Sequence, residues 1–155
     1  LHQKVSVSQE GIIVDKIARV SEIPLFCTCL TVPKDIKLSD ISNHAIHKFL
    51  ESDNDFTLLH WVTSTHAMKI ILPHCKDQEL AIYHYLGAYT ASLLTTNTDS
   101  INKSDITQGI NWDQAKEIAC KSNDDHTIKL VYSCWQEYID SNNKIYKTVT
   151  KQRIK

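Results

Sequence analysis

The chain has 155 residues, which suits one domain built around a single hydrophobic core. Lysine and arginine together number 17 and aspartate and glutamate 18, so the net charge of −1 gives no reason to expect a nucleic acid or an anionic membrane as partner. No apolar run approaches the roughly 20 residues that span a bilayer, and the sequence shows no secretory signal.

The turn residues predict the fold class. Three glycines and three prolines are too few for the turns of a β-sandwich or an α/β domain, so we expect an all-α fold, one compact domain of five to seven helices over residues 1–155. Because the chain begins at Leu1 rather than Met, we also expect a fragment of a larger helical protein. Five cysteines, an odd number without a C-x-x-C pair, favour reduced and mostly buried thiols in a cytoplasmic protein.

The first third of the chain predicts two helices and one ambiguous segment. Residues 11–24 place apolar side chains at helical spacing, and Pro24 ends the pattern. Residues 25–32, LFCTCLTV, are rich in β-forming residues but fit an extended linker or a short buried helix equally well. Ser39 or Asp40 is a suitable N-cap for a helix that continues through Leu50. The side expected to be buried consists of Ile41, Ala45, Ile46, Phe49 and Leu50.

The longest apolar segment is LLHWVTSTHAMKIILP, residues 58–73. Capping residues at 52–55 precede it, and Pro73 cannot continue a helix, so we expect a helix over 58–72 at the centre of the domain.

The remaining residues predict four more helices, from 77 or 78 to 94, over 112–121, over 125–139 and over 145–154, with a polar surface loop at 95–109. The side chains expected to face the core are Leu80, Tyr83, His84, Gly87, Ala88, Ala91 and Leu94 in the first, Ala115, Ile118 and Ala119 in the second, and Ile128, Leu130, Val131, Cys134, Trp135 and Tyr138 in the third.

Two histidines lie inside the apolar central helix. His60 and His66 are six residues apart, which leaves their side chains roughly 120° apart around a helix. Thr63 is three residues from each and could bond to either ring. They are either core histidines with satisfied hydrogen bonds or ligands in a water-poor site. Both could bind one centre only if the helix is distorted between them or if their side chains reach around its edge.

A second group lies at the start of the helix over 125–139. His126 and Lys129 share a face, and Asp124 and Asp125 precede them. A solvated surface histidine is the alternative. The sequence contains no G-x-S-x-G nucleophile elbow, no glycine-rich phosphate loop, no dinucleotide or flavin motif and no H-E-x-x-H.

These segments resemble the C-terminal part of the questin oxidase-like family. In that family an LH-x-V-T-x-x-HA helix and a later D-x-H-x-x-K helix recur in this order, as in LLHWVTSTHAMKIILP, ELAIYHYLGAYTA and SNDDHTIKLVYSCW here. The resemblance covers roughly residues 56–146, whereas 1–55 match only loosely.

The resemblance implies an all-helical oxidase of polyketide-derived aromatic compounds, acting by Baeyer–Villiger-type oxidation or oxidative ring cleavage. One branch of the family resembles a non-haem iron oxygenase, whose metal is held by histidines and a carboxylated lysine. Carried over, the metal ligands would be His60, His66, His126 and, as the carbamate, Lys129. The resemblance also allows NADPH as a cofactor. It implies no catalytic side chain apart from the metal ligands.

The family is much longer, and its N-terminal half contributes another histidine-bearing helix. No motif licenses His44 or His47 for that role, so we expect a missing N-terminal segment or a second chain to complete the site. His84 stands where the family often has a large aromatic residue, and we interpret it as a core residue. The alternative function is a non-catalytic helical binding or interaction module, in which the histidines only form a buried polar network.

Overall fold

The computed structural model describes residues 10–29, 31, 33, 35–96 and 109–154. Over these residues the chain forms eight α-helices, one 3₁₀ turn and no strand, which confirms the all-α class. The count exceeds the expected five to seven because the ambiguous segment contributes a short helix. The elements are α1 (Ile13–Ser21), α2 (Pro24–Cys29), α3 (Leu38–Glu51), α4 (Phe56–Ile71), η1 (Leu72–His74), α5 (Gln78–Leu93), α6 (Trp112–Lys121), α7 (Asp125–Ser141) and α8 (Ile145–Arg153).

Local signals explain where the helices begin. The Asp55 carboxylate accepts a hydrogen bond from the backbone N–H of Leu58 at 2.9 Å and caps α4. Asp40 does not act as the N-cap of α3 but lies three residues inside it, where its carboxylate accepts from the N–H of Lys37 at 2.9 Å. Both carboxylates satisfy a backbone donor that the helix itself leaves without a partner.

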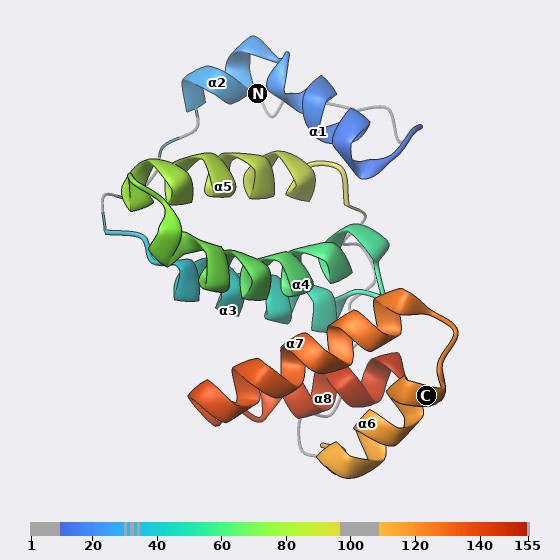
Figure 1. Ribbon diagram of the computed structural model, residues 1–155. Helices are drawn as coiled ribbons and strands as arrows, with labels where there is room; N and C mark the ends of the chain where they lie inside the picture. The colour runs from blue at the N-terminus through green and yellow to red at the C-terminus, as the bar shows by residue number, and fades with distance from the viewer. Residues whose placement is uncertain (1–9, 30, 32, 34, 97–108, 155) are drawn as a thin grey trace.

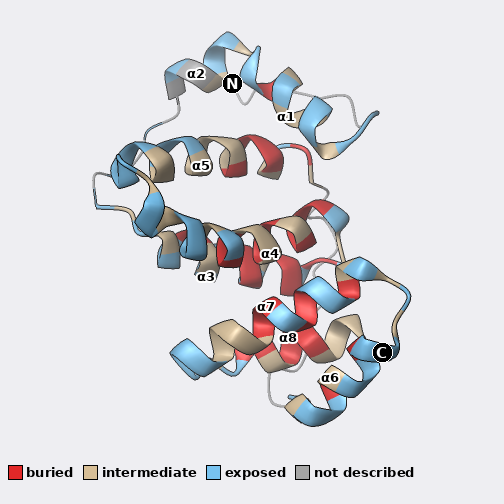
Figure 2. Cartoon of the chain, viewed as in Figure 1, coloured by how far each residue is buried: buried red, intermediate tan, exposed pale blue. Residues whose placement is uncertain are grey.

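The core lies where α3, α4, α7 and α8 meet (Figures 1 and 2). All five residues expected on the inner side of α3 are buried. The core cluster consists of Ile46, Phe49, Leu50, Leu58, Leu59, Val62, Leu130, Cys134, Ile145, Tyr146 and Val149. Since α4 contributes to this cluster and its Trp61 also packs with Tyr89 of α5 in a second cluster, the central place expected for this helix is confirmed.

The α4 and α7 helices pack side by side and run in the same direction. Near their starts His60 contacts His126, and near their ends Lys69 bonds with Asp140. Figure 1 shows both helices crossing the molecule from right to left. This parallel arrangement brings the two segments that carry the candidate residues into one interface.

The expected inner face of α5 is confirmed at Ala91 but wrong at four of the other positions. Leu80, Tyr83 and Leu94 are 50%, 45% and 53% exposed, and His84 is exposed rather than a core residue. The helix is apolar on nearly every side, so sequence periodicity does not single out one face. The structure buries Ala91, which was expected to face the core, together with Tyr89, which was not, because α1 and α4 cover those sides.

Other expected core positions differ at single residues. Ile118 of α6 and Ile128 of α7 are exposed, whereas Ala115, Ala119, Leu130 and the rest of the expected buried positions of these two helices are buried or partly buried. Of the three cysteines whose side chains are described, all free, only Cys134 is buried. Most of the expected 95–109 loop, residues 97–108, lies outside the described residues. No helix in the described part of the chain has the length and apolar character needed to cross a membrane.

Candidate functional site

His60 lies in the second turn of α4 and is half-buried. Its Nδ1 is 2.7 Å from the backbone oxygen of Phe56. A carbonyl oxygen can only accept, so Nδ1 carries the proton, and in the neutral ring Nε2 carries the lone pair. This is the arrangement of a histidine that is prepared to bind a metal or accept a proton through Nε2.

His126 lies in the first turn of α7 and faces His60 across the interface. The two ring centroids are 5.1 Å apart, and Phe56 packs against both rings, at 4.4 Å from His60 and 4.8 Å from His126. Nδ1 of His126 lies 3.0 Å from Asp125 and 3.4 Å from Asp124. Since carboxylates also accept, Nδ1 is again the engaged nitrogen and Nε2 remains for another partner.

His66 lies further along α4 and is only 8% exposed. Its Nδ1 is 2.9 Å from a carboxylate oxygen of Glu137 on α7, and Tyr132 lies edge-on to the ring at 5.7 Å. Nε2 is buried and has no hydrogen-bond partner among the described residues. His66 therefore repeats the pattern of the other two rings, in a much drier place.

Lys129 is exposed on α7, and its ammonium forms an ion pair with Asp125 at 2.6 Å. The same carboxylate group faces the ring of His126 through its other oxygen. Lys129 thus lies near the candidate site but is bound to an acid, and a carbamate there would place a further negative charge beside Asp125. In this arrangement Lys129 does not fit as a metal ligand.

The three rings and Lys129 do not meet at one point. Among the described residues, the only group of at least three histidine, cysteine or acidic side chains whose ligand atoms all lie within 4.8 Å of one another is Asp124, Asp125 and His126. Six residues of helix separate His60 from His66 by roughly 9 Å along the axis. His60 and His126 are in contact with each other, whereas His66 is bonded to Glu137.

The acidic residues beside His126 are fixed by hydrogen bonds. The Thr127 hydroxyl, at 2.6 Å, and the Arg153 guanidinium hold the pKa of Asp124 well below its ordinary value. The Lys129 ammonium likewise lowers the pKa of Asp125. Both groups are therefore carboxylates at neutral pH, and each is already paired with a cation, Asp124 with Arg153 and Asp125 with Lys129.

His60 also lines a pocket of about 720 Å³ between the start of α1 and the first half of α4. Its aromatic walls are Phe56 and Trp61, and hydroxyl groups come from Thr63 and Ser64. The full lining is Gly11, Ile12, Ile13, Val14, Lys16, Asp55, Phe56, Thr57, His60, Trp61, Thr63, Ser64 and Thr95. A largely apolar pocket of this size is typical of sites for small organic ligands.

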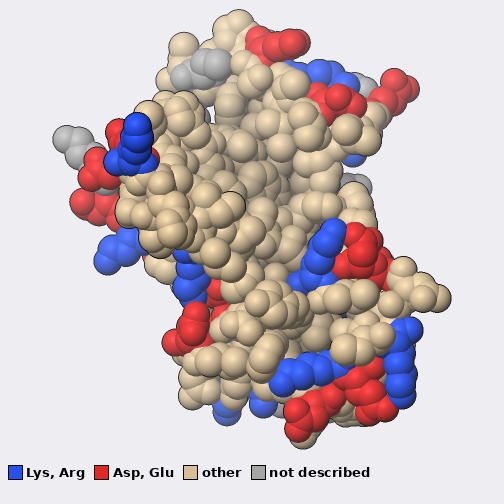
Figure 3. Space-filling view, in the orientation of Figure 1, with Lys and Arg blue, Asp and Glu red and all other residues tan. Residues whose placement is uncertain are grey.

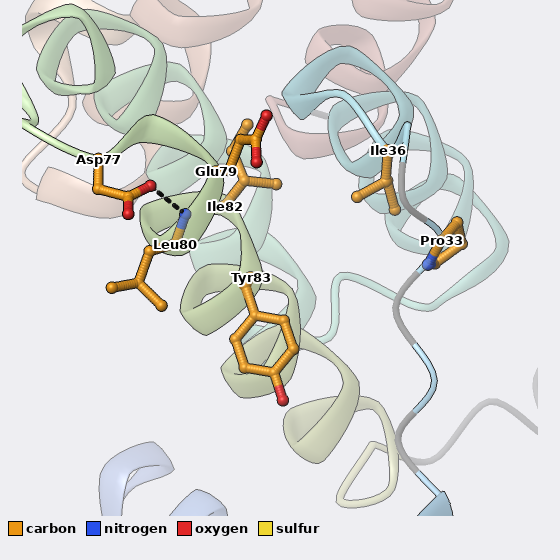
Figure 4. A pocket seen from close by; sticks show the side chains of 7 residues that line it. All are labelled: Pro33, Ile36, Asp77, Glu79, Leu80, Ile82 and Tyr83. Atoms are coloured by element: carbon orange, nitrogen blue, oxygen red, sulfur yellow. Dashed lines mark hydrogen bonds between the residues drawn. The ribbon is translucent and has the colours of Figure 1, made fainter.

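A second pocket, of about 690 Å³, lies at the exposed start of α5 (Figure 4). Pro33 and Ile36 face Ile82 and Tyr83 across it, and its acids are Asp77 and Glu79. The Asp77 carboxylate is already engaged by the N–H of Leu80 at 2.9 Å. This pocket contains no histidine, so it offers no comparable chemistry.

The other histidines in the described part of the chain do not join these groups. His44 bonds through Nδ1 with the hydroxyl of Tyr89 at 2.7 Å, on the side of α3 that faces α5. His47 is exposed. Glu137 and Phe56 were missed by sequence reasoning, because a lone glutamate in a helix and the first residue of an apolar segment carry no signal of their own.

Comparison with known proteins gives one family. The family model described as Questin oxidase-like matches residues 42–134 of the chain. No curated protein and no solved structure matches it. The match begins earlier and ends earlier than the resemblance over 56–146 suggested, and it contains His60, His66, His126 and Lys129 but not Glu137.

Proposed function

The chain belongs to the questin oxidase-like family, a family of oxidoreductase type, and we propose that it takes part in the oxygen-dependent oxidation of a polyketide-like aromatic compound. The reaction would be a Baeyer–Villiger-type oxidation or an oxidative ring cleavage. The proposal includes a cytoplasmic location and NADPH as a source of electrons.

One observation supports this proposal most strongly. His60 is both a wall of the apolar pocket and a direct neighbour of His126. An aromatic substrate in the pocket would therefore lie beside a pair of imidazoles. Phe56 and Trp61 offer ring surfaces for stacking, and the hydroxyl groups of Thr63 and Ser64 could orient a carbonyl or phenol oxygen.

The donor set fits a metal at the His60–His126 pair. Each ring has Nδ1 held by an oxygen acceptor, which leaves Nε2 to coordinate, and imidazole suits iron. When bound, iron would supply the electron transfer to oxygen that protein side chains cannot perform. His66 and Lys129 would join this centre only after a rearrangement, because His66 is bonded to Glu137 further along α4 and Lys129 would first have to leave Asp125 and react with carbon dioxide.

The chain's own residues have simpler tasks in this proposal. The Phe56 carbonyl and the Asp125 carboxylate orient the two imidazoles, and the ring of Phe56 shields both from water on one side. The site is not closed to solvent, because Phe56 itself is 53% exposed. A further segment of the protein or a second chain would close it.

A non-catalytic binding or interaction module is the second candidate function. It is favoured by the network in which His66, Glu137, Lys69 and Asp140 join α4 to α7, because such a network stabilises a fold without any chemistry. The two functions differ in what they require of His126, which lies outside that network.

Replacing His126 with alanine tests the proposal. We expect the purified protein to contain iron, measured by elemental analysis, and His126→Ala to lose it while circular dichroism shows unchanged helicity. His84→Ala is the matched control, since His84 is an exposed histidine of α5 far from the pair in sequence and should retain the metal. Iron retained by His126→Ala, or absent from the unaltered protein, would contradict the proposal.

A further inference from the structure

Lys16 is a half-buried residue of α1 that lines the pocket beside His60. Its ammonium has no ion pair or hydrogen bond with any other residue in the described ranges of the chain. Lys69 offers a contrast, because it lines a smaller pocket of about 130 Å³ and is bonded to Glu137 and Asp140. The pocket beside His60 therefore carries a positive charge with which no described carboxylate forms an ion pair.

Two acids could compete for Lys16, and both have other partners. Asp55, the acid of the described pocket lining, accepts a hydrogen bond from the backbone N–H of Leu58 at 2.9 Å and lies at the positive end of the α4 dipole. Asp15 precedes Lys16 in the sequence, and its carboxylate accepts from the backbone N–H of Ile12 at 3.1 Å. An anionic group of a ligand could therefore bind the Lys16 ammonium without displacing an acid of the protein.

The hydroxyl groups of the lining are mostly engaged within the protein. Thr63 donates to a backbone oxygen of its own helix at 3.1 Å, and Thr95 donates to a backbone oxygen three residues earlier at 2.7 Å. Ser64 shares a hydrogen bond with the Tyr85 hydroxyl at 2.7 Å. The hydroxyl oxygens can still accept a hydrogen bond from a phenol, but the Lys16 ammonium is the charged donor of the lining, and charged donors form the stronger bonds.

We propose that Lys16 is the specificity-determining residue of this pocket and that the ligand is an aromatic acid, ionised at neutral pH. Its anionic oxygen bonds with the Lys16 ammonium, and its rings pack on Phe56 and Trp61. The inference rests on the proposed function for the assignment of the pocket as the substrate site, and it names the substrate class. The binding itself requires no metal.

A lysine can select an anion here because the pocket is largely apolar. The contact between an ammonium and a carboxylate is screened less in such surroundings than in bulk water, and the lysine stem can pack against apolar surface while its charge meets the ligand. A neutral aromatic compound of the same shape would gain the ring contacts but not this bond. The charge of the ligand should therefore decide which aromatic compounds bind tightly.

The affinities of two small aromatic probes at neutral pH test this role. The probes 2-naphthoate and 2-naphthamide share one ring system and have nearly the same size, but only the naphthoate is charged. We expect the unaltered protein to bind 2-naphthoate about 10-fold more tightly, measured by isothermal titration calorimetry, because it gains one charge-assisted bond. Lys16→Met should remove this preference by weakening the binding of naphthoate alone.

Two further variants serve as controls. Lys16→Arg keeps the positive charge and should keep the preference, whereas Lys76→Met removes an exposed lysine outside the pocket lining and should change neither affinity. Equal affinity of the unaltered protein for both probes, or no binding of either, would overturn the inference. A preference that survived Lys16→Met would overturn it too, since a bound iron rather than Lys16 would then attract the carboxylate.

The indole N–H of Trp61 reports where the probe lies. This buried group has no hydrogen-bond acceptor in the described structure, whereas Trp135 lies on α7 with the Lys116 ammonium over its ring. In proton–nitrogen NMR spectra we expect 2-naphthoate to shift the Trp61 resonance and not that of Trp135, and the opposite result would overturn the inference. A protein that bound naphthoate through Lys16 but contained no iron would refute the proposed function alone, and one with iron but no preference would refute the inference alone.

Discussion

The two ends of the α4–α7 interface place a histidine of α4 in contrasting surroundings. At the start, His60 meets His126 beside a pocket and near exposed ion pairs. Toward the other end, His66 is buried against Glu137. Both rings have Nδ1 bonded to an oxygen and Nε2 left over, so one helix pair presents the same chemistry once in an open site and once in a dry one.

The two ends of the interface should differ in how well they tolerate amino-acid substitutions. Figure 3 shows a broad face without charged side chains over the middle of the molecule, with acids and bases gathered toward its edges. Charges at an edge are solvated and their pairs contribute little to stability, whereas a buried bond leaves a costly unpaired donor when it is broken. The open end should therefore tolerate substitution, and the buried end should not.

The largest expected effect is a difference between the two ends in how much a lost carboxylate lowers the free energy of unfolding. Glu137→Ala leaves Nδ1–H of His66 buried without an acceptor, so we expect it to lower the free energy of unfolding by about 1–3 kcal/mol. Asp125→Ala, the matched loss of a carboxylate at the open end, should have a much smaller effect because Asp125 and its partner Lys129 are exposed. Urea unfolding followed by circular dichroism measures both, and equal losses would contradict the distinction.

Acid should weaken the open end in a way that depends on Arg153. The pKa of Asp124 is lowered in the folded protein, first by the Thr127 hydroxyl and also by the Arg153 guanidinium, so its stabilising contribution is present above its ordinary pKa. That contribution is lost as the pH falls below about 4 toward the folded value. We expect the stability of the unaltered protein to fall over this range.

Thr127→Val and Arg153→Met test this origin. Each removes a group that lowers the pKa of Asp124, so stability should fall less steeply in acid than in the unaltered protein, in urea titrations at successive pH values. Lys48→Met is a suitable control, since it removes an exposed ion pair with Glu51 on another helix. An unchanged slope in both variants would exclude Asp124 as the source.

The fold was largely predictable because most helices carry one apolar side. The buried face of α3 and the position of α6 follow directly from spacing and capping residues. The prediction of the buried face of α5 failed for a physical reason. A helix that is apolar on nearly every side does not indicate which side its neighbours will cover. A six-residue helix such as α2 is equally beyond periodicity, which needs two or more turns.

The candidate site was predictable only in part. Spacing placed His60 and His66 on different sides of one helix, and the structure indeed directs them to different partners. That His60 would meet His126, and His66 would meet Glu137, depends on the parallel packing of helices about 70 residues apart. No local pattern encodes that packing, so the sequence could name the histidines but not the acid that orients one of them.

The position of a bound iron ion is the most direct test of a metal centre at His60 and His126. In a crystal of the protein prepared with iron(II) under anaerobic conditions, the anomalous difference map at the iron edge would locate the ion. We expect a peak within bonding distance of Nε2 of His60 and of His126, at the open end of the α4–α7 interface. A peak at any place away from these two rings, or no peak at all, would contradict it.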